Sequence, residues 1–266
     1  VSSTCYLLAP AFSSAERARA RAAYGTHRDV LANVTAAIAW GNLVFLPALL
    51  LIVTGAEQWQ TGPLAVLQTT FERIGEMPPL VVFLALVGLD LALILVIYTR
   101  LLLPGATTRT ELGLVGSHLS RNVALGILAA LVILLASGVI GYAMSQFGVR
   151  QTQAEQLNLR HAPPTIFYLI LAAGALLAPI AEEMFFRGYV FRAYLTSMGP
   201  LAAYLISAAL FGILHLNLPA FLPLAVIGII LAFAFRITGS LVPAIVAHGL
   251  NNALALLLVY YVAGMP

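Results

Sequence analysis

Long apolar stretches separated by short polar segments run along almost the whole chain. A helix that crosses a bilayer needs about 20 mostly apolar residues, and about seven stretches meet or approach that length. They lie at about 30–55, 78–99, 122–147, 164–184, 200–217, 219–235 and 241–263. The pattern predicts an all-α fold, a polytopic membrane helical bundle with about seven transmembrane helices, or eight if a further helix precedes the first.

The fifth and sixth stretches are short, and only Asn217 and Leu218 separate them before Pro219. So tight a link predicts a helical hairpin, because two helices joined by a very short loop must lie side by side. The sequence shows no internal repeat and no segment outside the apolar stretches long enough for a second domain. We therefore expect a single membrane domain over 1–266.

Composition supports this prediction and excludes a water-soluble protein. Hydrophobic residues occupy 61% of the 266 positions and charged residues 9%, whereas a soluble domain carries roughly 25% charged residues. All thirteen basic residues are Arg, and they form no basic stripe interleaved with aromatic residues. We therefore expect the lipid bilayer as a partner and no nucleic acid.

The placement of the arginines predicts the orientation of the bundle. Ten of the thirteen fall before the first stretch or in loops that an alternating topology puts on the same side, and three fall on the other side. Because cytoplasmic loops are enriched in Arg and Lys, the N-terminus is expected in the cytoplasm. The Ala-rich, Lys-free composition favours an integral protein of a prokaryotic cell membrane.

Few ionisable residues fall inside the apolar stretches, and each is a functional hypothesis because burying a charge in lipid is costly. They are Asp90, Glu182, Glu183, His215 and His248. Asp90 lies midway along the second stretch. A catalytic role and a pair between helices both fit this position, and we interpret Asp90 as structural.

The spacing around residue 182 separates the roles of two neighbouring carboxylates. Glu183 and Arg187 are four residues apart, so on a helix they share a face and form an ion pair. Glu182 is rotated from Glu183 by about 100° and has no such partner, which leaves it available to take up a proton. Pro179, just before them, is expected to kink the helix and open space for water.

Two further pairs have the same four-residue spacing. Phe211 and His215 share one helical face, as do His248 and Asn252, whose side chains then point together as two hydrogen-bond donors. Counting residues from the loops places Glu182 and His215 at similar depths and His248 nearer the cytoplasmic end. We expect them to converge on one polar cavity in the cytoplasmic half of the membrane.

These motifs, taken together and in this order, resemble the CPBP family. The family comprises CAAX-type prenyl endopeptidases and bacteriocin-processing or immunity-related membrane proteins, and is also called the Abi family. The resemblance covers about 164–258, the expected catalytic core. The residues that carry it are Glu182-Glu183-x-x-x-Arg187, Phe211-x-x-x-His215 and His248-x-x-x-Asn252.

The resemblance implies an intramembrane endopeptidase that hydrolyses a peptide bond of a membrane-associated or hydrophobic peptide or protein, without a cofactor. In it Glu182 activates water with help from His215, while His248 and Asn252 bind the oxyanion. The residue types agree, because Glu and His can deprotonate water and two donors on one face can stabilise a tetrahedral oxyanion. The residues expected to support this site are Glu183, Arg187 and Phe211.

Two alternatives stay open. A zinc protease would use Glu182, His215 and His248 as ligands, with an open position for water, although no His-Glu-x-x-His helix is present. A bacteriocin-immunity or transport-type membrane protein would use the buried charges without catalysis. The internal repeats typical of transporters are not visible. No feature predicts an oligomeric state.

Overall fold

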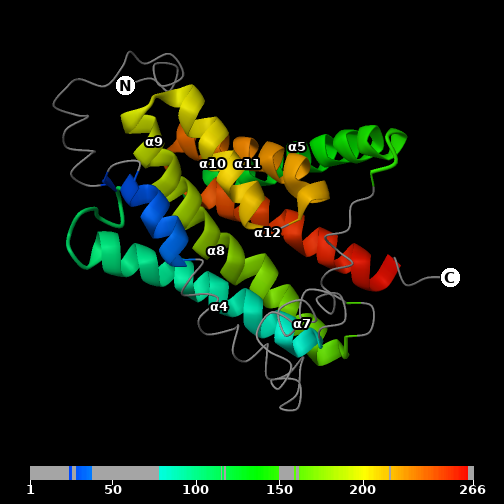
Figure 1. The fold of residues 1–266 in the computed structure, drawn as a ribbon. Coiled ribbons are helices and arrows are strands. Elements are labelled where there is room, and N and C mark those ends of the chain that lie inside the picture. Colours follow the sequence, from blue (N-terminus) through cyan, green and yellow to red (C-terminus); the bar gives the residue numbers. More distant parts are fainter. Residues whose placement is uncertain are drawn as a thin grey trace, which may run out of the picture.

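The computed structural model describes residues 24–25, 28–37, 78–114, 116, 118–149, 159, 162–215 and 217–262. Within these ranges the regular elements are all helices and none is a strand, which confirms the all-α prediction. The helices pack along one another as a bundle (Figure 1). The chain is therefore a helical membrane bundle.

The bundle is built from six long helical segments beyond residue 78, several of which pass from α-helix into π-helix without a break. The first two are α4 (Pro79–Ile97), continued by η4 (Tyr98–Leu102), and α5 (Leu119–Gln146). The third comprises α7 (Pro164–Ala172), η6 (Ala173–Leu177), α8 (Ala178–Glu183), η7 (Met184–Phe191) and α9 (Arg192–Ser197). The last three are α10 (Pro200–Leu214), α11 (Leu218–Thr238) and α12 (Val242–Leu257), continued by η8 (Leu258–Val262).

Five of these segments are long and apolar enough to cross a membrane. The sixth, α10, has 15 residues and is shorter than a usual span. The predicted span 30–55 lies mostly outside the described residues, of which 28–37 are helical. The segment Pro164–Ser197 has 34 residues. At about 1.5 Å per residue it is longer than a hydrocarbon core of about 30 Å.

The predicted hairpin is present as α10 and α11, which pack along each other. The Asn217 side chain caps α11 by accepting a hydrogen bond from the backbone N–H of Ala220 at 2.9 Å. The expectation that the whole of 200–217 is helical is wrong at the C-terminal end, as His215 shows. It follows the last residue of α10 as the C-cap and therefore lies at the tip of the hairpin, where the chain turns to cap α11.

The loop between α4 and α5 packs on the turn between α11 and α12. The Leu241 N–H donates to the Gly113 carbonyl at 2.8 Å. Gly113 has φ of +90°, and a Cβ there would lie 2.7 Å from the Phe235 ring, so the position requires glycine. Glu111 in the same loop interacts electrostatically with Arg192. Loops that the alternating topology puts on one side therefore do meet at one end of the bundle.

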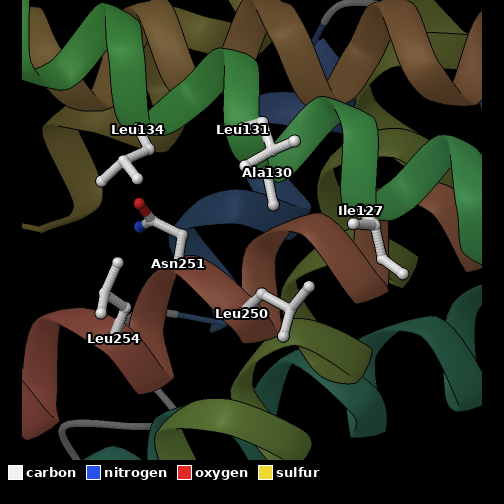
Figure 2. Close-up of a pocket in the computed structure, with 7 residues that line it drawn as sticks. All are labelled: Ile127, Ala130, Leu131, Leu134, Leu250, Asn251 and Leu254. Carbon is white, nitrogen blue, oxygen red and sulfur yellow. The ribbon is translucent and has the colours of Figure 1, made fainter.

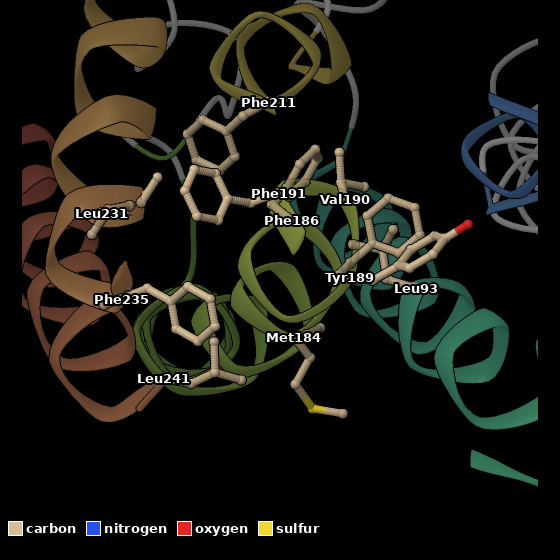
Figure 3. Close-up of a cluster of buried hydrophobic side chains, with 14 of the residues drawn as sticks. Leu93, Met184, Phe186, Tyr189, Val190, Phe191, Phe211, Leu231, Phe235 and Leu241 are labelled. Carbon is tan, nitrogen blue, oxygen red and sulfur yellow. The ribbon is translucent and has the colours of Figure 1, made fainter. Parts of the chain in front are cut away.

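The core of the bundle surrounds η7, in which every residue from Met184 to Phe191 is buried. Figure 3 shows Phe186 and Phe191 of this segment close to Phe211 and Phe235 from the neighbouring helices. The Phe186 and Phe211 rings meet edge to face with centroids 5.2 Å apart. Because all eight residues are buried, neighbouring helices cover this segment on every side. This segment therefore sits at the centre of the molecule and fixes the position of the motif just before it.

Candidate active site

The predicted ion pair between Glu183 and Arg187 is present and fully buried. Arg187 Nη1 lies 2.8 Å from Glu183 Oε1, and neither side chain is exposed. The Arg187 Nη2 group also donates to the Gly228 carbonyl of α11 at 3.2 Å. The guanidinium carbon lies 4.6 Å from the centre of the Phe211 ring on α10. The pair thus links two successive turns of the motif helix and connects that helix to α10 and α11.

Glu183 also holds His248 of α12. His248 Nδ1 lies 2.9 Å from the same Glu183 oxygen that Arg187 contacts. A carboxylate only accepts hydrogen bonds, so Nδ1 carries the hydrogen and the imidazole is held in a fixed orientation. Sequence reasoning missed this contact, because no local spacing relates residues 65 positions apart.

Glu182 has a different environment from its neighbour. Its Oε2 lies 4.0 Å from His248 Nε2, too far for a direct hydrogen bond. The same oxygen is buried and has no hydrogen-bond partner among the described residues. Glu182 and His248 therefore face each other closely, without a direct hydrogen bond.

His215 joins this region through Phe211. Its Nδ1 lies 2.8 Å from the Phe211 carbonyl oxygen, which can only accept, so Nδ1 donates and the opposite nitrogen, Nε2, can accept. The Phe211 ring lies 4.9 Å from the His215 ring and 5.7 Å from the His248 ring. One aromatic ring thus contacts both imidazoles. In the described part of the chain, His215 makes no hydrogen bond to Glu182.

Asn252 fastens α12 to the π-helical segment η6. Its Nδ2 donates to the Gly174 carbonyl at 2.9 Å. One turn earlier, a Cβ on Gly249 would lie 2.5 Å from the Ala175 carbonyl oxygen, so the two backbones touch there. Pro179 has no N–H to offer the Ala175 carbonyl, and the helix adapts through the π-helical turns rather than breaking. One N–H of the Asn252 amide remains for a substrate, since the group has two.

Asp90 belongs to this region more closely than its sequence position indicates. It is 2% exposed on α4, which packs on α8. Its carboxyl group interacts electrostatically with that of Glu182. Its Oδ2 is buried without a hydrogen-bond partner among the described residues. No pattern in the sequence relates Asp90 to Glu182. A single acidic residue in a long apolar stretch nevertheless indicates a functional position.

A separate cavity of about 230 Å³ lies between α5 and α12 (Figure 2). Its lining is apolar except for Asn251, which points toward Leu134 of α5. Asn251 and Asn252 are adjacent on a helix and so point about 100° apart. Only Asn252 is turned toward η6 and the motif helix. This cavity is therefore distinct from the region around Glu182.

The described residues contain no group of three His, Cys, Asp or Glu side chains arranged to hold a metal ion. A catalytic zinc needs three protein ligands at about 2.0–2.2 Å. Of the three ligands expected for zinc, Glu182 and His248 face each other at 4.0 Å, whereas the Nδ1 atom of His215 is bound to the Phe211 carbonyl. The donor set does not fit a zinc site in this arrangement.

Comparison with known protein families relates the motif region to a peptidase family. Residues 164–254 match the model described as type II CAAX prenyl endopeptidase Rce1-like. Neither the curated proteins nor the solved structures contain a match to the chain. The match begins with α7, ends within α12 and includes every motif residue from Glu182 to Asn252. Over residues 164–254 the chain is therefore similar to the Rce1-like type II CAAX prenyl endopeptidases, which confirms the predicted resemblance to the CPBP family.

Proposed function

We propose that the protein is an intramembrane endopeptidase in which Glu182 is the general base. The observation that carries this proposal is the contrast between two adjacent carboxylates. Glu183 is bound by Arg187 and His248, whereas Glu182 Oε2 faces His248 Nε2 at 4.0 Å with no hydrogen-bond partner in the described residues. A base must have a free lone pair beside the water that it deprotonates.

The reaction follows from this arrangement. Glu182 takes a proton from water, and the hydroxide oxygen bonds to the carbonyl carbon of the scissile peptide. The resulting tetrahedral intermediate carries a negative oxygen. Glu182 then returns the proton to the amide nitrogen as the C–N bond breaks, giving a carboxylic acid and an amine. No metal takes part in any of these steps.

His248 and Asn252 are placed to stabilise the oxyanion. Glu183 accepts the Nδ1–H of His248, so that Nε2 points toward Glu182, and Nε2 donates to the oxyanion once it too carries a hydrogen. Asn252 is one helical turn further along α12 and keeps a second amide N–H beside its bond to Gly174. Each such donor is worth about 3–4 kcal/mol in the transition state of other hydrolases. His215, with Nδ1 bound to the Phe211 carbonyl, offers Nε2 as an acceptor that orients the water.

The substrate class follows from the position of the site within membrane-spanning helices. A peptide must enter from the bilayer or its surface, so we propose a membrane-associated or lipid-modified peptide, in keeping with the prenyl endopeptidase family. We also propose that the end bearing Arg100, Arg109, Arg121 and Arg192 faces the cytoplasm.

The test is the Glu182→Gln variant, with Glu111→Gln as a matched control outside the site. The amide keeps the shape of the side chain but cannot take a proton. Turnover should fall by about 10²–10⁴-fold, while peptide affinity and folding stay close to those of the wild type. Cleavage is first screened by mass spectrometry of membrane peptides from cells producing either protein. The purified protein is then tested on a farnesylated peptide and its unmodified counterpart.

Three outcomes separate the alternatives. Near-normal cleavage by Glu182→Gln would contradict the mechanism in which Glu182 is the base. Tightly bound zinc in the wild type, lost together with activity in the variant, would favour the zinc protease. No cleavage of any peptide by the wild-type protein would favour a non-catalytic immunity or transport role.

A further inference from the structure

The proposed mechanism leaves one buried acid unused, Asp90 of α4. It is 2% exposed, and its Oδ2 is buried without a hydrogen-bond partner among the described residues. Its carboxyl group interacts electrostatically with the proposed base, Glu182. Transferring an ionised carboxylate to such a site is costly unless a cation or several hydrogen bonds compensate.

Among the described residues, the charged groups around Asp90 provide no such compensation. Among the elements that pack most closely on α4, η6 contains no titratable residue, and the two acids of α8 add negative charge. The nearby cation of η7, Arg187, is committed to Glu183 at 2.8 Å. The remaining groups on these elements are Tyr189, bound to Asn33 at 2.7 Å, Tyr168, bound to Tyr261 at 2.9 Å, and Tyr98 and Arg100 at the end of the helix.

We propose that Asp90 is a positioning residue that keeps its proton, so that it and Glu182 together carry one negative charge. Two interacting buried carboxyl groups cannot both ionise easily, and one of them retains a proton. Asp90 has no described cation, whereas Glu182 faces His248. The proton therefore stays on Asp90, and Glu182 is the ionised member that takes the proton from water.

This arrangement matters for the transition state, in which negative charge develops on the substrate carbonyl oxygen. A second carboxylate close to Glu182 would raise the energy of that oxyanion. A neutral Asp90 leaves His248 and Asn252 opposed by fewer negative charges. The inference rests on the proposed peptidase function, because it concerns the same general base.

Infrared spectroscopy of the purified protein in lipid vesicles at neutral pH tests the protonation directly and needs no substrate. The wild type should show a C=O stretching band of a protonated carboxylic acid that Asp90→Asn abolishes and Glu182→Gln retains. A spectrum that Asp90→Asn leaves unchanged would show that Asp90 is ionised and overturn the proposal. If Asp90→Asn does not fold, Asp90→Glu carries the same test, and the band should move in frequency instead of disappearing.

A wild type that cleaves no peptide would refute the peptidase function, while the infrared band would still decide the state of Asp90.

Discussion

Two long helices of this bundle, α5 and the helix from Pro164 to Ser197, have opposite relations to their surroundings. The more apolar of them, α5, has a mean hydropathy of 2.8 over its most apolar 18 residues. Its Leu135 and Val139 side chains are each 70% exposed. The other has a value of 1.9, and its η7 segment is entirely buried. In a bilayer the exposed face contacts lipid tails, so apolar residues there have no need of a protein partner.

The difference shows that polarity, rather than hydrophobicity, decides which membrane helix lies at the centre. Glu183 and Arg187 require hydrogen-bond partners that lipid cannot supply, and they find them in each other, in His248 and in the Gly228 carbonyl. A helix carrying such groups must be surrounded by other helices. The central position of the motif is thus a condition of its stability as well as of its chemistry.

The largest expected difference between the two helices is tested by removing a central charge and, separately, a lipid-facing side chain of α5. Arg187→Ala leaves Glu183 buried without its cation, which should cost about 3–5 kcal/mol of stability and lower activity. Leu135→Ala on α5 removes a side chain that is 70% exposed, so its effect should stay within about 0.5 kcal/mol. Thermal unfolding of both variants in the same detergent measures the difference.

An Arg187→Ala protein as stable and active as the wild type would mean that the ion pair does not order the motif. A Leu135→Ala protein as unstable as Arg187→Ala would mean that the exposed face of α5 packs on protein. Either result would remove the distinction between the two helices.

A sharper comparison uses two adjacent amides of α12, which face the two helices separately. Asn252 donates to Gly174 of the motif helix, whereas Asn251 points into the cavity beside α5. Asn252→Ala should lower turnover by about 10²–10³-fold through loss of an oxyanion donor, and Asn251→Ala should leave turnover near the wild-type value. Cleavage rates are measured at saturating peptide, with unfolding temperatures recorded alongside, because the bond to Gly174 also contributes to folding.

Equal losses of turnover in the two variants would assign both amides to helix packing alone. A loss of turnover in Asn252→Ala that is accompanied by a large drop in unfolding temperature would assign Asn252 to the hydrogen bond with Gly174 rather than to the oxyanion.

The local parts of the site could be predicted from the sequence, and the contacts between distant segments could not. Four-residue spacing on a helix fixes neighbours, so the Glu183–Arg187 pair was predictable. The bond from His248 to Glu183 depends on how α12 packs on α8, which no spacing reveals. The same holds for Asp90, whose position beside Glu182 arises from the packing of α4 on α8.

The π-helical turns were also beyond prediction, although a cause can be seen in the sequence. Pro179 indicated a kink, but the helix continues through η6, and Gly249 lets α12 approach the Ala175 carbonyl there. The outcome depends on a glycine that lies 70 positions away from the proline. Residue patterns within one helix therefore predict where the backbone is perturbed, while the neighbouring helix determines the form of the perturbation.

The smallest expected effect lies in the loop that joins α4 to α5, outside both helices. Glu111 accepts hydrogen bonds from the Thr108 N–H at 2.8 Å and the Thr108 hydroxyl at 3.0 Å, and from Thr107 Oγ1 at 3.3 Å. The Thr108 N–H and then its hydroxyl hold the pKa of Glu111 below its ordinary value, with a weaker contribution from Arg192. A carboxyl group with a lowered pKa in the folded state stabilises the fold above its unfolded pKa and loses that contribution as the pH falls.

Glu111→Gln should therefore lower the unfolding temperature slightly at neutral pH, by much less than Arg187→Ala, because Glu111 is exposed and screened by solvent. The difference between variant and wild type should shrink as the pH falls from about 4.3, the ordinary pKa of Glu, through the lower folded value. Thermal unfolding of both proteins across this pH range measures it. A difference that stays constant down to the lowest pH would mean that the Glu111 charge does not hold the loop. A difference as large as that of Arg187→Ala would mean that an exposed loop carboxylate stabilises this protein as much as its buried ion pair, and would end the contrast between surface and centre.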